Sequence, residues 1–177
     1  MTQPLLAVVV AWLGRSGIPC ALIGAAALAV RGVARSTFDL DLFTTDVRAL
    51  DPDTWRELGD SRARVTVRRG DADDPLAGVV RIESPDQRTV DVIVGRWEWQ
   101  DAIVRRAEPI EIENAVIPVV RASDLILLKL YAGGSQDAWD IEQLLAAGDR
   151  ETLVVAVTAE LDSLPGDARA RWRRIAG

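Results

Sequence analysis

Three aspartates stand in strand-like stretches of the sequence, and together they could hold a metal ion. Asp39 and Asp41 are one residue apart in the run 38–43, and Asp91 lies in the middle of the apolar run 89–94. Alternate residues of a strand share a face, so Asp39 and Asp41 would lie roughly 6–7 Å apart at the backbone. Carboxylates that close repel each other unless a positive charge lies between them, and Mg²⁺ prefers oxygen ligands. If the two strands are neighbours, the pattern predicts a site for Mg²⁺ or Mn²⁺ at Asp39, Asp41 and Asp91.

The same carboxylates also have structural explanations. Asp39 and Asp41 could be solvent-facing residues of an edge strand. Asp91 could be a structural carboxylate paired with Arg88 or Arg81, because an aspartate among apolar strand residues is costly unless it is paired, hydrogen-bonded or bound to a metal. The metal hypothesis depends on all three residues occurring together.

A glycine at the end of an earlier apolar stretch complements the carboxylates. Gly24 ends the strand-like run 20–24 and precedes the small residues 25–30, which predict a short helix. A glycine at such a junction lets backbone N–H groups approach a phosphate, with the positive end of the helix behind them. The segment 24–41 therefore predicts a phosphate site close to a metal site.

The composition limits the other kinds of chemistry. The 177 residues include no histidine and one cysteine, Cys20, which excludes Ser-His-Asp triads, His-ligated zinc and internal disulfides. The net charge is -6 and the pI about 4.8, so nucleic acid could bind only through a local basic patch. The apolar run 4–13 is too short to cross a bilayer and lacks the flanks of a signal peptide. We therefore expect a cytoplasmic protein with no membrane partner.

The elements that must position these residues follow from the pattern of apolar residues and breakers. Strands are expected at 20–24, 38–43, 63–68, 78–82, 89–94 and 110–117, and helices at 4–15, 25–30, 52–58 and 97–107. After Pro118 the pattern is helical to the end. We expect an α/β (α+β) fold with a mixed sheet flanked by helices at 1–118, followed by a C-terminal helical segment at 119–177.

The ordered motifs resemble those of the polymerase-β-type nucleotidyltransferase superfamily. That family has a hydrophobic residue and Gly-Gly or Gly-Ser, a helix, an Asp-x-Asp strand and a third Asp on a later strand. Within it, the stretches 123–132 and 137–141 resemble the short AbiEii-like branch of toxin–antitoxin systems. The resemblance covers residues 20–46, 88–95 and 118–145, and it is carried by Gly24, Asp39, Asp41, Asp91, Lys129, Asp137 and Asp140.

The resemblance implies a role for each matching residue. Asp39, Asp41 and Asp91 would be the catalytic and metal-binding residues, and Asp91 could also take the proton from the acceptor hydroxyl. A larger group would contact the nucleotide: Gly24, Ala25, Arg35, Ser36, Thr37 and Lys129. Lys129 would contact the triphosphate or pair with Asp137 or Asp140. These two aspartates would support the site without contacting the nucleotide.

The resemblance also implies a function and leaves its acceptor open. The activity would be transfer of an NMP from an NTP to a hydroxyl, with a tRNA 3′ end as a candidate acceptor and a cognate antitoxin as a possible protein partner. A protein or small-molecule hydroxyl is an alternative acceptor. A different alternative is a non-catalytic protein of this fold that binds a nucleotide or a partner, which two departures favour: Ala25 replaces the second Gly or Ser, and Gln136 replaces the usual Arg or Lys.

Overall fold

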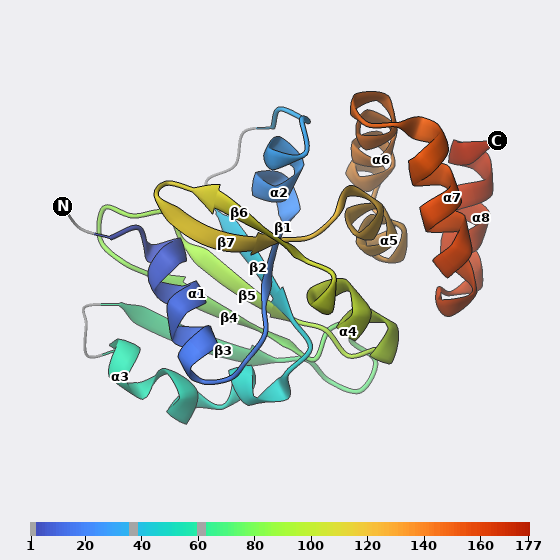
Figure 1. Ribbon diagram of the computed structural model, residues 1–177. Coiled ribbons are helices and arrows are strands. Elements are labelled where there is room, and N and C mark those ends of the chain that lie inside the picture. Colours follow the sequence, from blue (N-terminus) through green and yellow to red (C-terminus); the bar gives the residue numbers. More distant parts are fainter. Residues whose placement is uncertain (1–2, 36–38, 60–62) are drawn as a thin grey trace. The chain divides into compact units, whose positions relative to one another are not determined.

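The computed structural model describes residues 3–35, 39–59 and 63–177 (Figure 1). The chain divides into two compact units. The first contains residues 1–26 and 36–120, and the second contains residues 27–35 and 121–177. Residues 27–35, which precede the Asp-x-Asp strand, thus belong with the C-terminal helices rather than with the sheet.

The first unit is built on a seven-stranded sheet with the order β3-β4-β5-β2-β1-β7-β6. Its strands are β1 (Ala21–Ile23), β2 (Leu40–Thr44), β3 (Arg64–Arg69), β4 (Gly78–Glu83), β5 (Val90–Val94), β6 (Glu108–Ile112) and β7 (Ala115–Val119). β2 pairs with β5 and β1 with β7 in parallel, and the other neighbours are antiparallel. The predicted mixed sheet is confirmed.

The two faces of this sheet differ sharply in the centre. One face is apolar and buried, with Leu42, Val80 and Val92 fully inaccessible to solvent. The helix α1 (Leu5–Arg15) packs against β5 and β7 (Figure 1), and the 3₁₀ turn η1 (Val47–Leu50) packs against β4 and β5. Because side chains alternate along a strand, the residues between these apolar ones point to the other face. That other face carries Asp41, Arg81 and Asp91.

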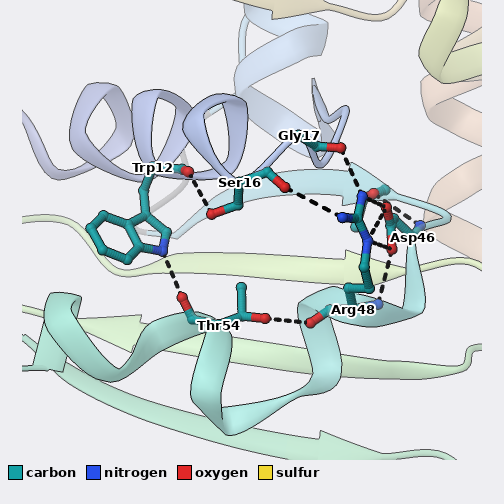
Figure 2. A network of polar contacts seen from close by, with 7 residues as sticks. Trp12, Ser16, Gly17, Asp46, Arg48 and Thr54 are labelled. Carbon is teal, nitrogen blue, oxygen red and sulfur yellow. Dashed lines mark hydrogen bonds and ion pairs between the residues drawn. The ribbon is translucent and has the colours of Figure 1, made fainter.

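A polar network ties α1 to the segment after β2 (Figure 2). The indole of Trp12 donates to the carbonyl of Thr54 at 2.8 Å, and the Arg48 guanidinium donates to the carbonyl of Gly17 at 2.8 Å. Arg48 also pairs with Asp46, whose carboxylate caps η1. The network fixes the far side of the sheet, away from the face with the aspartates.

Two predicted elements of the first unit are wrong in detail. The extended run expected at 110–117 is a hairpin of β6 and β7, because Glu113 and Asn114 both adopt positive φ and form a two-residue turn. The helix expected at 52–58 is a 3₁₀ turn, η2 (Pro52–Trp55), followed by the short α3 (Arg56–Gly59). The helix expected at 97–107 is α4 (Glu98–Arg105), which packs against β2.

The second unit is helical, as expected from the sequence after Pro118. Its helices are α5 (Ala122–Ala132), α6 (Ser135–Ala147), α7 (Arg150–Glu160) and α8 (Gly166–Ala176), with the 3₁₀ turn η3 (Leu161–Ser163) after α7. α5 packs against α6, α7 and α8 and buries Leu125, Ile126 and Leu130. Gly133 ends α5 in the left-handed conformation that favours glycine. No helix in the described part of the chain has the length and hydropathy needed to cross a membrane.

Candidate active site

Three strands of the first unit place one arginine and two aspartates in a single row. β2 and β5 are parallel neighbours with Asp41 opposite Asp91, and β4 pairs with β5 so that Arg81 is also opposite Asp91. Asp39 precedes β2 on the same side as Arg81. We call Asp39, Asp41, Arg81 and Asp91 the sheet cluster. The condition for the metal hypothesis, that the strand of Asp91 lies beside that of Asp41, is met.

Gly24 lies directly against the carboxylate of Asp41. It follows β1, it begins the seven-residue helix α2 (Gly24–Val30), and its φ is +65°. A Cβ atom on this residue would lie 2.1 Å from Oδ2 of Asp41. Only glycine combines this backbone conformation with such a close approach. The residue is therefore needed for the position of Asp41 as well as for the turn from β1 into α2.

Arg81 is the cation of the sheet cluster. Its Nη2 donates to Oδ2 of Asp39 at 2.8 Å, and its Nε lies 3.4 Å from Oδ1 of Asp91. The side chains of Arg81 and Asp39 are nearly half exposed, at 45% and 44%. The possible pairing of Asp91 with Arg81 is thus present. Among the described residues, however, the buried Oδ1 of Asp91 has no hydrogen-bond partner.

The environment of Asp91 makes its carboxyl a better proton acceptor than an ordinary aspartate. Burial raises the pKa of Asp91 above its usual value, the Arg81 guanidinium lowers it, and the carboxylates of Asp39 and Glu83 raise it. The net effect is upward. The side chain of Asp91 is 18% exposed. A carboxylate with a raised pKa suits a general base.

The donors of the sheet cluster fit a hard divalent cation in chemical type. Asp41 and Asp91 share a face as in-register neighbours, and Oδ1 of Asp91 accepts no hydrogen bond within the described residues, although Nε of Arg81 lies 3.4 Å away. Carboxylate oxygens are the ligands that such cations prefer. The described residues do not contain three or more carboxylate, thiol or imidazole groups already gathered into a metal site. Asp39 instead faces Arg81.

Lys129 lies in a second cluster of charges, inside the helical unit. Its Nζ donates to Oδ1 of Asp137 at 2.9 Å and to Oδ2 of Asp140 at 2.5 Å. Arg35 also donates to Oδ2 of Asp140 at 2.5 Å. Asp140 is fully buried and Lys129 is only 12% exposed. We call Arg35, Lys129, Asp137 and Asp140 the helix cluster; of the two arrangements expected for Lys129, pairing with the aspartates is the one present.

Ala25, Arg35, Ser36 and Thr37 are the remaining residues predicted to bind the nucleotide. Ala25 is the second residue of α2, and Arg35 belongs to the helix cluster. Ser36 and Thr37 lie outside the described residues. The sheet cluster belongs to the first unit and the helix cluster to the second.

Some features of the sheet cluster were not anticipated from the sequence. The row of Arg81, Asp91 and Asp41 depends on strand register, and the contact of Gly24 with Asp41 depends on the pairing of β1 with β2. The position of Arg81 itself has a local sequence signal, because this charged residue stands between the apolar residues Val80 and Ile82 in β4. A charged residue at that position marks the open face of the sheet.

Comparisons with known proteins identify the fold. No protein-family model matches the sequence, and no curated protein matches it. Among solved structures, the chain resembles ANT(2'')-Ia in complex with adenylyl-2''-tobramycin, with 16% identity, a TM-score of 0.57, and coverage of 89% of this chain and 95% of that one. It also resembles TM1012 of Thermotoga maritima, a candidate nucleotidyltransferase, with 14% identity, a TM-score of 0.54, and coverage of 81% and 92%.

A third similar structure is an antigenic nucleotidyltransferase-like protein from Paracoccidioides brasiliensis. It shares 15% identity, with a TM-score of 0.51 and coverage of 96% of this chain and 90% of that one. The chain therefore has the nucleotidyltransferase fold expected from its motifs. At these identities the likeness concerns the fold, and the more specific AbiEii-like branch is not among these structures.

Proposed function

We propose that this protein is a nucleotidyltransferase that moves an NMP from an NTP to an acceptor hydroxyl. The acceptor oxygen would form a bond to the α-phosphorus, the bond from that phosphorus to the bridging oxygen would break, and pyrophosphate would leave. The observation that carries the proposal is the row of Asp41 and Asp91 on neighbouring strands, with Gly24 packed against Asp41. This arrangement occurs on an open sheet face in a nucleotidyltransferase fold.

The aspartates would act in two ways. Asp39, Asp41 and Asp91 would hold Mg²⁺ or Mn²⁺, which when bound supplies positive charge for the attacking hydroxyl and the leaving pyrophosphate. Asp91 would also accept the proton from the acceptor hydroxyl. Arg81 balances the negative charge of Asp39 and Asp91 and keeps their carboxylates oriented.

The other predicted residues would contact the nucleotide. The backbone N–H groups at Gly24 and Ala25 would approach the triphosphate, because glycine leaves room there. Arg35, Ser36 and Thr37 would contact phosphates from the segment before β2. Lys129 would contribute to triphosphate binding, and Asp137 and Asp140 would orient its amine.

Three kinds of acceptor are consistent with the motifs and the fold. The AbiEii-like motifs favour a tRNA 3′ end, with a cognate antitoxin as protein partner. The likeness to a structure that contains adenylyl-2''-tobramycin favours a small hydroxylated molecule. A protein hydroxyl is a third possibility. The single cysteine and the NTP donor both favour the cytoplasm.

A label-transfer assay tests the proposal. The purified protein is incubated with Mg²⁺ or Mn²⁺, with each NTP labelled at the α-phosphate, and with total RNA, protein lysate or small-molecule extract. We expect label to reach one acceptor class, and we expect Asp39→Ala and Asp41→Ala to abolish it. The matched control is Asp53→Ala, which removes an exposed aspartate of the same unit that pairs with Arg56.

The same assay separates the non-catalytic alternative. The hydrogen bond of Asp39 to Arg81, Ala25 in the predicted phosphate loop and Gln136 before Asp137 are the observations that favour a binding protein. That alternative predicts nucleotide binding that persists in Asp39→Ala, with no transfer by the wild type to any acceptor class.

A further inference from the structure

A groove opens beside Asp91 on the open face of the sheet. It has a volume of about 320 Å³, and Asp91 and Arg81 form one end of it. From there it runs over β4 and β3 to the loop that joins these strands. It is lined by Arg68, Arg69, Gly70, Asp74, Leu76, Gly78, Val79, Arg81 and Asp91. Asp91 belongs to the row of carboxylates where the proposed reaction takes place, so the groove begins beside the position of the acceptor hydroxyl.

The outer wall of the groove is a loop held in place by Arg96. The Arg96 guanidinium donates to the carbonyls of Asp71, Ala72 and Leu76 at 2.6, 3.0 and 3.0 Å. The loop is also tightly packed at Gly70, where a Cβ atom would lie 2.3 Å from the carbonyl oxygen of Leu76. The wall is thus preorganised, which reduces the entropic cost of ligand binding.

Arginines and aspartates line the groove in near balance, because Asp39 also pairs with Arg81. Three of its lining residues are arginines and two are aspartates, whereas the whole chain has a net charge of -6. Arg81 is occupied by Asp39 and Asp91, and Arg69 donates to the carbonyl of Leu50 at 2.8 Å. Within the described part of the chain, the exposed side chain of Arg68 makes no hydrogen bond or ion pair. It lies two residues along β3 from Thr66, which is opposite Arg81.

The size of the groove indicates a small ligand. Its volume of about 320 Å³ lies at the lower end of small-molecule pockets, roughly 300–1,000 Å³. Arg68 is two strands from Asp91 and offset by two residues along them, which is about 12 Å at the backbone. The long arginine side chain covers part of that span, so a hydroxyl at Asp91 and a group bound by Arg68 would be about one sugar ring apart.

We infer that the acceptor is a small hydroxylated molecule carrying an anionic group, phosphate or carboxylate, which Arg68 binds in this groove while its hydroxyl lies at Asp91. This inference rests on the proposed transferase function and specifies its substrate class. Arginine suits the task because its planar guanidinium binds phosphate and carboxylate through paired hydrogen bonds. An acceptor carrying amino groups would meet like charge at Arg68.

A binding experiment tests the groove without any turnover. Protein labelled with ¹⁵N is titrated with inorganic phosphate or with succinate, and the arginine Nε–Hε resonances are followed against sodium chloride of equal ionic strength. We expect the Arg68 resonance, identified by its loss in Arg68→Gln, to shift saturably with one of the two anions, which also shows whether phosphate or carboxylate is preferred. Groove backbone resonances should show affinity about tenfold weaker in Arg68→Gln.

The matched control is Arg64→Gln. Arg64 is an exposed arginine on the same face of β3, four residues before Arg68 and outside the groove. Its replacement should leave anion affinity unchanged. The inference is overturned if neither anion shifts the groove resonances beyond the chloride effect, or if both variants weaken binding equally.

A transfer experiment tests the acceptor itself. Cell extract freed of macromolecules by ultrafiltration is separated on a strong anion exchanger, and each fraction is offered as acceptor with Mg²⁺ and α-labelled NTPs. We expect acceptor activity in the retained fractions and about a tenfold rise in acceptor KM for Arg68→Gln. Activity only in unretained fractions, or only with the RNA or protein left on the filter, would overturn the inference. Transfer to no acceptor at all would count against the proposed function, and the anion titration would still decide whether the groove binds anions.

Discussion

The sheet cluster and the helix cluster use the same chemistry in opposite surroundings. Each combines aspartates with arginine or lysine, and each contains a buried carboxylate oxygen without a hydrogen-bond partner among the described residues, Oδ1 of Asp91 in one and Oδ1 of Asp140 in the other. In the helix cluster Asp140 is fully buried and its other oxygen accepts from both Lys129 and Arg35. In the sheet cluster Arg81 and Asp39 are nearly half exposed.

This difference separates structural from chemical roles. Removing one partner of a buried ion pair strands a charge away from water and costs about 3–5 kcal/mol, whereas an exposed pair contributes about 0–1 kcal/mol. Replacements in the helix cluster should therefore lower the stability of the fold more than they lower activity directly. Replacements in the sheet cluster should leave stability nearly unchanged and lower activity, because a substrate can reach those carboxylates.

The largest expected effect is that of Asp41→Asn in the sheet cluster. We expect transfer to fall about a thousandfold or more, because the neutral amide is a poor cation ligand and no longer stabilises charge at the reacting phosphate. The free energy of unfolding should change by no more than about 1 kcal/mol, since Asn has the same shape and removes repulsion with Asp91.

The measurements are initial rates of label transfer and urea unfolding of the same preparation. A variant that unfolded much more easily than the wild type would show that Asp41 is a structural residue. The comparison between the clusters would then lose its basis.

Asp140→Asn should give the largest loss of stability. The replacement leaves Lys129 and Arg35 beside a neutral amide at a fully buried position, so we expect the free energy of unfolding to fall by about 3 kcal/mol. Urea unfolding followed by far-ultraviolet circular dichroism measures this. The control is Asp162→Asn in the same unit, where the aspartate is fully exposed. If Asp140→Asn kept its stability but lost transfer, the helix cluster would have the chemical role instead.

Gly24→Ala tests the link between the backbone and the sheet cluster. The added Cβ would collide with Oδ2 of Asp41, so we expect transfer to fall about a hundredfold through misplacement of that carboxylate. Gly17→Ala is a matched control, because Gly17 has nearly the same φ, +64°, with no atom within 4 Å of its added Cβ. Both variants carry the backbone strain of about 1–3 kcal/mol. If Gly17→Ala lost transfer to the same extent, strain alone would explain the result.

The sequence predicted the strands well because their apolar alternation is local. The runs expected at 78–82 and 89–94 match β4 and β5 to within one residue at each end. The hairpin of β6 and β7 was missed because its turn, Glu113 and Asn114, lacks glycine and interrupts the apolar pattern only briefly. A short polar interruption between two strands gives little local information about chain reversal.

The candidate site was predictable in its residue types and only partly in its contacts. Gly24, Asp41 and Asp91 stand out because glycine and aspartate are unusual at the ends and centres of apolar strands. The pairing of Arg81 with Asp39 could not be predicted, because it joins residues 42 positions apart through the order of strands in the sheet. The same holds for Arg35 and Asp140, which are 105 positions apart.

Asp46→Asn is expected to have the smallest effect and tests whether exposure and pairing alone make a site. Asp46 pairs with Arg48 in the first unit, outside the sheet cluster (Figure 2). The hydrogen bond from Arg48 lowers the pKa of Asp46 below its usual value. A carboxyl whose pKa is lower in the folded than in the unfolded state stabilises the fold above its unfolded pKa, and that contribution is lost as the pH falls through the folded pKa.

Wild type and Asp46→Asn should therefore differ by about 0.5 kcal/mol in the free energy of unfolding near neutral pH. The difference should shrink as the pH falls below the usual range for an aspartate, which urea unfolding at a series of pH values would show. Asp46 borders a separate pocket of about 350 Å³, but it is paired with Arg48, caps η1 and lies outside the row of Asp41 and Asp91. Transfer should therefore be unaffected. If Asp46→Asn lowered transfer as much as Asp41→Asn does, any aspartate–arginine pair in this unit would matter for transfer. The row of Asp41 and Asp91 would then not be identified as the active site.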